Sequence, residues 1–367
     1  MDSTKTKIKR ESKRKIKADF DRSPLKDRLK AKFLNFYFFS NVIVKIFRFV
    51  FLLGIAYVVL FPFFSKIAGS FMGPQDFVDV TVRLIPKNFT LDIYKAIWAE
   101  LGYFEAFTNT LFLSLSTALI QTFICSFVAY GIAKFKFKGN KLVFMAVIFS
   151  LIVPHQTLRL SLFMSFRYFD IFGIFSFLNG GGLTIPFTNT TVLQGLVDVI
   201  PDSWEKFSSS GIMLTNSFWP LIIMSLCGLA FKNGLYIFML RQFYKGVPDE
   251  LEESAYIDGS GVLRTYFKII LPLSVPMMIT VFLFAFSWQW TDDFYTDVFF
   301  PGSDTVLMPD IVGVPNSLST DYAGQNLYYA AIRNACGIMI IAPLIVVYLF
   351  CQKYLVQGIE RSGLTAD

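Results

Sequence analysis

Six long apolar stretches, separated by charged and polar segments, dominate the sequence. Each is close to the roughly 20 residues that a helix needs to cross the hydrocarbon core of a membrane. We therefore predict an all-α, polytopic protein with six transmembrane helices. The predicted spans are Val42–Ser65, Ala106–Ala133, Leu142–Leu158 continuing toward Ser165, Phe207–Phe231 continuing to Leu240, Ile269–Thr291 and Asn334–Gln352.

Composition supports this interpretation. Of the 367 residues, 54% are hydrophobic and only 17% are charged, which is too little polar surface for a soluble domain of this length. Thirteen of the 34 Lys and Arg residues lie between Lys5 and Lys32, so the net charge of +7 belongs to a tail and indicates no groove for nucleic acid. The basic segments after the second and fourth spans lie on the same side as this tail, which the positive-inside rule makes cytoplasmic. Both termini are therefore predicted to be cytoplasmic.

The pattern divides the chain into five parts. We expect a basic cytoplasmic tail (1–41), an anchor helix (42–66), an extracytoplasmic segment (67–105), a five-span core (106–359) and a cytoplasmic end (360–367). The tail either lies on anionic lipid as an amphipathic helix or is disordered and only sets topology, and both interpretations remain open. Two long outward segments, 170–206 and 292–333, are functional or flexible by their length.

Several kinds of chemistry are excluded by what the sequence lacks. There is no GxxxxGK[ST] phosphate-binding motif, so any ATP must be hydrolysed by another protein. A single histidine leaves no basis for a histidine triad or an HExxH metal site, and the four cysteines lie in apolar runs without CxxC spacing. We expect neither an enzyme nor a cofactor or metal site in this chain.

The connection between the fourth and fifth spans, 241–276, has the clearest local signals. Pro248 suits a first helical turn, acidic residues follow it, and Gly259 is a natural C-terminal stop, which predicts a helix of about three turns. A second short helix, Val262 to Ile270, should follow, before Pro272 and Pro276 bend the chain toward the fifth span. Because the first helix is acidic, a protein partner fits better than a lipid surface. One face is predicted to hold Val247, Leu251, Ser254, Ala255 and Asp258.

This connection resembles the EAA loop of ABC importer permeases, which reads E-A-A, two residues, D-G, then twelve residues to L-P. Glu253-Ser254-Ala255, Asp258-Gly259 and Leu271-Pro272 fall at these spacings. Pro154-His155-Gln156 and the aromatic-acidic stretch from Trp288 to Phe294 are similar to the carbohydrate-uptake branch, in particular to the smaller maltose-permease subunit. The chain thus resembles a binding-protein-dependent transport system inner membrane component with a MetI-like permease core.

The resemblance implies a bacterial cytoplasmic membrane protein that works in a complex. The implied partners are a second homologous permease, two copies of a cytoplasmic ABC ATPase that binds ATP and Mg, an extracytoplasmic solute-binding protein and membrane lipid. In this family the EAA helix sits in a cleft of the ATPase. The resemblance assigns polar contacts there to Glu253 and Asp258, close approach to Ala255 and Gly259, a pairing role to Arg264 and the bend to Pro272.

A second group of residues is predicted to line the solute pathway. Ionisable groups at membrane depth are expensive and are functional by default, and Arg159 lies one helical turn beyond His155 and Gln156. Trp288, Trp290 and Asp292 combine aromatic faces with a carboxylate, which suits sugars. The alternatives are that Arg159 extends to the membrane interface and that the tryptophans form an interfacial belt.

The expected cargo is a sugar or an oligosaccharide. A permease for a peptide, an amine or a phosphate ester is an alternative. A stand-alone secondary transporter is less favoured, because the predicted spans hold almost no carboxylates for ion coupling.

Overall fold

The computed structural model describes residues 36–170, 183–184, 191–192, 213–230, 232–319, 321 and 324–361, and it separates into two units, 1–65 and 66–367. Several sequence predictions lie outside the described residues. These are the basic tail as far as residue 35, most of the outward segment 170–206, the first part of the fourth span and the last residues of the chain.

The first unit contributes most of helix α3 (Phe36–Gly69), which includes the predicted anchor. Within it, the apolar span Val42–Ser70 buries none of its most apolar window inside the chain. A helix that is apolar on all sides and unburied in its own chain is suited to lie in lipid. Helix α3 thus extends beyond the predicted anchor, 42–66, at both ends.

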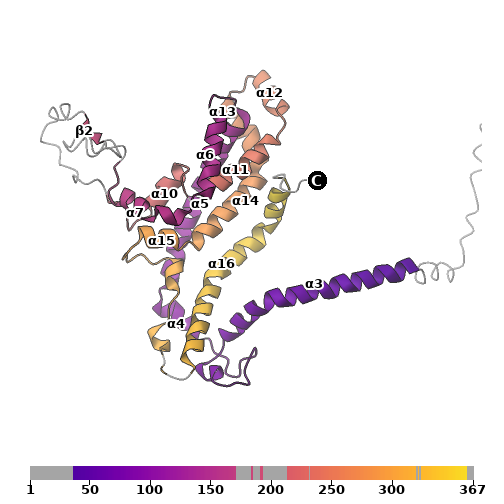
Figure 1. Cartoon of the computed structure of the whole chain (residues 1–367), viewed down its shortest axis with the longest axis vertical. Helices are drawn as coiled ribbons and strands as arrows, with labels where there is room; N and C mark the ends of the chain where they lie inside the picture. The colour runs from indigo at the N-terminus through magenta and orange to yellow at the C-terminus, as the bar shows by residue number, and fades with distance from the viewer. Residues whose placement is uncertain are drawn as a thin grey trace, which may run out of the picture. The chain divides into compact units, whose positions relative to one another are not determined.

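The second unit is a helical bundle organised around α5 (Tyr103–Lys134). Helices α10 (Trp219–Leu226), α11 (Asn233–Lys245) and α14 (Leu271–Trp290) pack on α5, and α16 (Gln325–Arg361) packs on α14. Figure 1 shows α5, α11 and α14 side by side, with α12 at one end of the bundle and α4 at the other. The buried face of α5 consists largely of small residues, which let neighbouring backbones approach closely: Ala106, Ser114, Ala118, Cys125, Ser126 and Ala129.

Helix α16 runs antiparallel to α14. The indole of Trp290 donates to the carbonyl of Ile340 at 2.9 Å, and the hydroxyl of Thr280 lies 3.4 Å from the carbonyl of Tyr354. Because the two helices run in opposite directions, the C-terminal part of α16 lies at the same end of the bundle as Lys134 and α12. This arrangement is compatible with the predicted common side of the basic segments.

The predicted third span is bent. Helix α6 (Asn140–Ile152) ends before Pro154, and η2 (His155–Leu158) with α7 (Arg159–Arg167) turns away from it by 93°. Val153 is extended, as the residue before a proline prefers, and Pro154 has no N–H to continue the helix. The prediction of a helix continuing to Ser165 was therefore wrong.

The predicted fourth span is not one continuous helix either. Helices α10 and α11 are separated by a break in which Gly228 and Lys232 both have positive φ, +70° and +67°. Among the described residues, four helices are long and apolar enough to cross a membrane, or five if the bent α6–α7 pair is counted as one span. The count of six spans thus stays a prediction.

The loop between α11 and α14 differs in detail from the prediction. Helix α12 (Glu250–Ile257) has about two turns instead of three, and Pro248 lies just before its N-cap, Asp249. Helix α13 (Val262–Thr265) leads through a π-helical segment, η3 (Tyr266–Ile270), directly into α14. The N–H of Leu271 bonds back to the carbonyl of Tyr266, five residues earlier, so a wider turn leads into Pro272, which lies in the first turn of α14, with Pro276 inside the helix. The bend predicted at these prolines stays a prediction.

The remaining elements are short. On the predicted outward side they are η1 (Pro74–Phe77), α4 (Asp92–Glu100), α15 (Phe294–Phe299), η4 (Met308–Ile311) and η5 (Asn316–Leu318). Because α15, η4 and η5 all lie in the outward segment 292–333, this segment is partly helical. Strands β1 (Leu183–Thr184) and β2 (Thr191–Val192) form an antiparallel pair in which Leu183 is opposite Val192.

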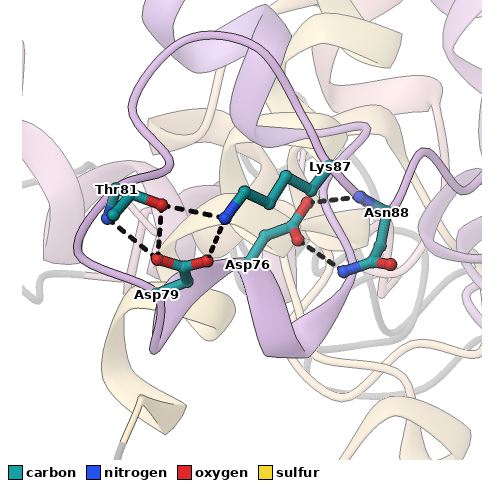
Figure 2. A network of polar contacts seen from close by, with 5 residues as sticks. All are labelled: Asp76, Asp79, Thr81, Lys87 and Asn88. Carbon is teal, nitrogen blue, oxygen red and sulfur yellow. Dashed lines mark hydrogen bonds and ion pairs between the residues drawn. The ribbon is translucent and has the colours of Figure 1, made fainter.

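The loop between α3 and α4 is closed by a polar network, which Figure 2 shows. The carboxylate of Asp76, only 3% exposed as a residue, accepts the backbone N–H of Asn88 at 3.0 Å and its side-chain amide at 2.7 Å. Nearby, Lys87 donates to Asp79 and to the hydroxyl of Thr81. The bond from Lys87 lowers the pKa of Asp79. Two turns of the loop are thus locked to each other.

A substitution at Gly234 tests the close packing of α11 on α6. A Cβ atom at this position would lie 2.5 Å from the hydroxyl of Ser150 and 2.9 Å from the carbonyl oxygen of Val147. We expect Gly234→Ala to destabilise the protein by about 1–3 kcal/mol through overpacking, seen as a lower melting temperature in detergent. Gly337→Ala, in α16 with no atom within 4 Å of the new Cβ, is the control and should melt no lower than the parent. Equal melting of both variants would contradict this packing.

Asp76 tests the loop network. Asp76→Ala removes the buried carboxylate that accepts two hydrogen bonds from Asn88, and the loss of these two bonds costs about 1–3 kcal/mol locally. We expect faster tryptic cleavage at Arg83 and Lys87 in the purified protein. Asp79→Ala, which removes a more exposed carboxylate, should accelerate cleavage less, and the reverse order would contradict the assignment of Asp76 as the anchor.

Candidate functional site

Helix α12 is attached to the rest of the bundle by a buried lysine. Lys134 is the last residue of α5, and its side chain is only 6% exposed. Its ammonium donates to the carbonyl of Val247 and to the carboxylate of Asp249, both at 2.6 Å, and lies 3.8 Å from the carboxylate of Glu252. Three groups around the first turn of α12 thus converge on one cation.

The two carboxylates of this cluster differ in environment. The hydrogen bond from Lys134 lowers the pKa of Asp249, which is otherwise exposed to solvent. Burial raises the pKa of Glu252, and its 3.8 Å distance from the ammonium is too long for a hydrogen bond. Asp249 therefore forms the short ion pair, and Glu252 is a buried carboxylate at its edge.

A hydroxyl network lies beneath this cluster. The hydroxyl of Ser126 on α5 is 2.5 Å from that of Tyr244 on α11 and 2.8 Å from that of Tyr266 in η3, and Tyr244 also reaches Ser274 on α14 at 3.2 Å. All four residues are buried. Because each hydroxyl finds a partner, four elements are joined below the loop that carries α12.

The structure exposes most of the residues predicted to couple to an ATPase. Glu253, Asp258, Arg264 and Pro272 are exposed. Gly259 has φ +78° and ends α12: its N–H bonds to Tyr256, and the next N–H bonds to Ala255, which is a Schellman motif. The predicted C-terminal stop is confirmed.

The predicted shared face of α12 was wrong in one respect. Val247 and Ala255 are buried against their own chain, whereas Leu251, Ser254 and Asp258 are exposed. A two-turn helix held at its first turn faces the bundle with Glu252 and Ala255 instead. Ala255 thus allows close approach of α12 to its own chain, and its predicted contact with an ATPase stays a prediction.

Sequence reasoning missed the apolar part of the exposed surface. Ile257 is 86% exposed and Leu263 is 59% exposed, on either side of Gly259. Large apolar side chains at such exposure beside an acidic helix are typical of a protein contact. The sequence did offer one signal for this surface, because Ile257 and Leu263 lie close to Gly259, the predicted end of the helix. The role of Lys134 was missed because it lies more than a hundred residues from its partners.

Two of the predicted pathway residues meet in one small pocket. Trp288 and Asp292 line it together with Gln289, Gln121, Tyr236 and Tyr295. The ammonium of Lys232, at the break before α11, lies 5.2 Å from the centre of the Trp288 ring, a cation–π geometry. An aromatic face, amides and a carboxylate therefore meet here, but the space between them is only ≈ 10 Å³, room for about one water molecule and not for a sugar.

The other predicted pathway residues lie elsewhere. His155 packs edge-on against Phe294 at 4.7 Å between ring centres, and Arg159 forms an exposed ion pair with Asp297 at 3.6 Å, so that both residues join the α6–α7 bend to α15. Gln156 is exposed beside them. Trp290 is fully buried in the core and bonded to α16, apart from the pocket.

Comparison with known proteins identifies the family. Residues 121–361, well over half of the chain, match the family described as binding-protein-dependent transport system inner membrane component. The chain belongs to this family. The permease is therefore a membrane component of a transport system, and the expected family resemblance is confirmed.

Individual relatives cover most of the permease. It is 23% identical over 310 residues to the inner membrane ABC transporter permease protein YcjP of Escherichia coli, covering 84% of this chain and 91% of the relative. It is 26% identical over 317 residues to the polygalacturonan/rhamnogalacturonan transport system permease protein YtcP of Bacillus subtilis, covering 84% and 93%.

A solved structure shows the same fold. The crystal structure of a bacterial ABC transporter involved in the import of the acidic polysaccharide alginate contains a chain that is 19% identical to this one, with a TM-score of 0.58. The likeness covers 86% of this chain and 97% of that chain. The predicted all-α permease fold is confirmed, with the short β1–β2 pair as an addition.

Arg159 is suited to a test of the pathway prediction. If its guanidinium binds the solute, Arg159→Leu should weaken solute affinity of the assembled transporter about tenfold or more, because a hydrogen bond to a charged group contributes ~1.5–3 kcal/mol. Asp297→Asn breaks the ion pair and keeps the arginine, so it should change affinity far less. The measurement is the concentration dependence of uptake in proteoliposomes, and an unchanged affinity in Arg159→Leu would favour the membrane-interface interpretation.

Proposed function

We propose that this permease forms half of the translocation pathway of an ATP-driven importer for a sugar or an oligosaccharide. A cytoplasmic ABC ATPase, present in two copies, binds ATP and Mg and docks on α12. A second, homologous permease completes the pathway, and an extracytoplasmic solute-binding protein delivers the cargo.

The observation that carries this proposal is the exposed surface of α12 and its C-terminal turn. The helix presents Glu253 and Asp258 to solvent, beside the apolar Ile257 and Leu263. An apolar centre with a polar rim is the usual composition of a protein interface. Since the chain lacks a phosphate-binding motif of its own, a separate ATPase is the partner that this surface fits best.

The cargo is inferred from the relatives. Relatives include permeases named for polygalacturonan and rhamnogalacturonan, for arabinooligosaccharides and for galactooligosaccharides. Peptides, amines and phosphate esters remain the alternative cargo class, and competition of uptake by each class distinguishes them.

Gly259 tests the docking of the ATPase. A Cβ atom there meets nothing within 4 Å of its own chain, so Gly259→Asp places a charged side chain on the surface that the ATPase approaches. We expect normal membrane insertion and loss of ATP-driven uptake in the reconstituted complex.

The matched control for this variant is Gly302→Asp. Gly302 has a similar positive φ of +69°, and a Cβ atom there also meets nothing within 4 Å. The backbone strain of the two substitutions is therefore alike, but Gly302 lies in the segment after α15, away from α12. Uptake at the parental rate in Gly259→Asp, or equal losses in both variants, would refute docking at α12.

A further inference from the structure

Helix α12 has little packing of its own to fix its position. Of its eight residues, only Glu252 and Ala255 are buried. Apolar burial on this scale stabilises a helix weakly, because each fully buried side chain contributes only about 1.5–3 kcal/mol. The polar attachment at its first turn must therefore do much of the positioning.

That attachment is made by Lys134. Its bond to the carbonyl of Val247 fixes the backbone before α12, and its bond to Asp249 fixes the N-cap residue, whose own carbonyl accepts the N–H groups of Glu252 and Glu253 at 3.0 Å. Charge-assisted bonds of this kind are about twice as strong as neutral ones. Because the lysine side chain is 6% exposed, water competes poorly for its ammonium.

Helix α5 connects this attachment to the opposite end of the bundle. Its 32 residues span ~48 Å. Near its first residues, the hydroxyl of Thr110 accepts the N–H of Met308 at 2.8 Å, and the amide of Asn109 donates to the carbonyl of Val306 at 3.1 Å. The segment that follows α15 is thus bonded to the same helix that Lys134 bonds to α12.

We propose that Lys134 is a positioning residue that joins α12 to α5, so that displacement of α12 moves α5 and the outward segment bonded to it. This inference rests on the proposed function, in which an ATPase displaces α12. The covalent route through α13 and η3 into α14 is a second connection, and Lys134 adds a direct one to the central helix of the bundle.

The experiment uses the complete complex, with both permeases, the ATPase and the binding protein, in liposomes. Uptake and ATP hydrolysis are measured in the same sample, and their ratio is the readout. The probe is whichever of radiolabelled arabinotriose, galactotriose and trigalacturonate the parental complex takes up. Co-purification of the ATPase with each variant verifies assembly, since loss of assembly would lower both rates together.

We expect Lys134→Met to lower the ratio of solute to ATP about tenfold, in the range by which residues along a coupled network change coupling. Lys134→Arg keeps a cation with several hydrogen-bond donors, so this variant should retain most of the parental ratio of solute to ATP. Lys138→Met is the matched control, because Lys138 is an exposed lysine in the connection after α5, and it should leave the ratio unchanged.

Asp249→Ala completes a double-mutant cycle. The Asp249 side chain is 78% exposed and makes no capping bond within α12, so its loss leaves the helix start intact. If Lys134 acts through Asp249, each single variant lowers the ratio and the double variant lowers it no further. Fully additive losses would overturn the proposal.

The remaining outcomes are also decisive. An unchanged ratio in Lys134→Met overturns the proposal and leaves the proposed function standing, provided the parental complex couples uptake to ATP. If Lys134→Met does not assemble, Asp249→Ala carries the test alone, and an unchanged ratio there overturns the proposal. A parental complex that takes up none of the probes in response to ATP, and whose ATPase does not co-purify, contradicts the proposed function itself.

Discussion

Close packing on α5 is the constraint on which the rest of the bundle depends. In a membrane the backbone must satisfy its hydrogen bonds internally, and helices associate through close contact and not through exclusion of water. The small residues on the buried face of α5 permit such contact with α10, α11 and α14. Two hydroxyl side chains on this face, Thr117 and Thr122, bond back to their own helix, whereas the buried hydroxyl of Ser114 has no hydrogen-bond partner among the described residues.

Two breaks in the apolar segments determine which partners two charged side chains, Arg159 and Lys232, meet. The turn at Pro154 carries α7 away from α6 toward α15, and the break at Gly228 and Lys232 separates α10 from α11. As a result, Lys232 approaches Trp288, and Arg159 approaches Asp297. In straight, unbroken helices Lys232 and Arg159 would lie at other positions along the membrane. The breaks therefore bring Lys232 to Trp288 and Arg159 to Asp297.

The sequence predicted the continuous helices better than the broken ones. The apolar runs Ala106–Ala133 and Ile269–Thr291 correspond closely to α5 and α14, although the second run contains Pro272 and Pro276. Pro154 was visible in the sequence, but a proline is compatible with either a kink or a 93° turn, and only packing of α7 on α15 decides between them. The pairing of Lys134 with Asp249 depends on α11 running parallel to α5, with Cys125 beside Asn233 and Lys134 beside Val247, and no local pattern encodes this arrangement.

The neighbouring carboxylates of α12 illustrate how one short motif serves two purposes. Glu252 faces the bundle and is buried beside Lys134, whereas Glu253 faces solvent. Adjacent residues on a helix point about 100° apart, so a pair of acidic residues can place one charge inward and one outward. Removal of a single member of a buried ion pair leaves an uncompensated charge, whereas an exposed carboxylate is readily solvated. The inward charge is therefore constrained by this chain, and the outward one only by the surface that α12 presents to a partner.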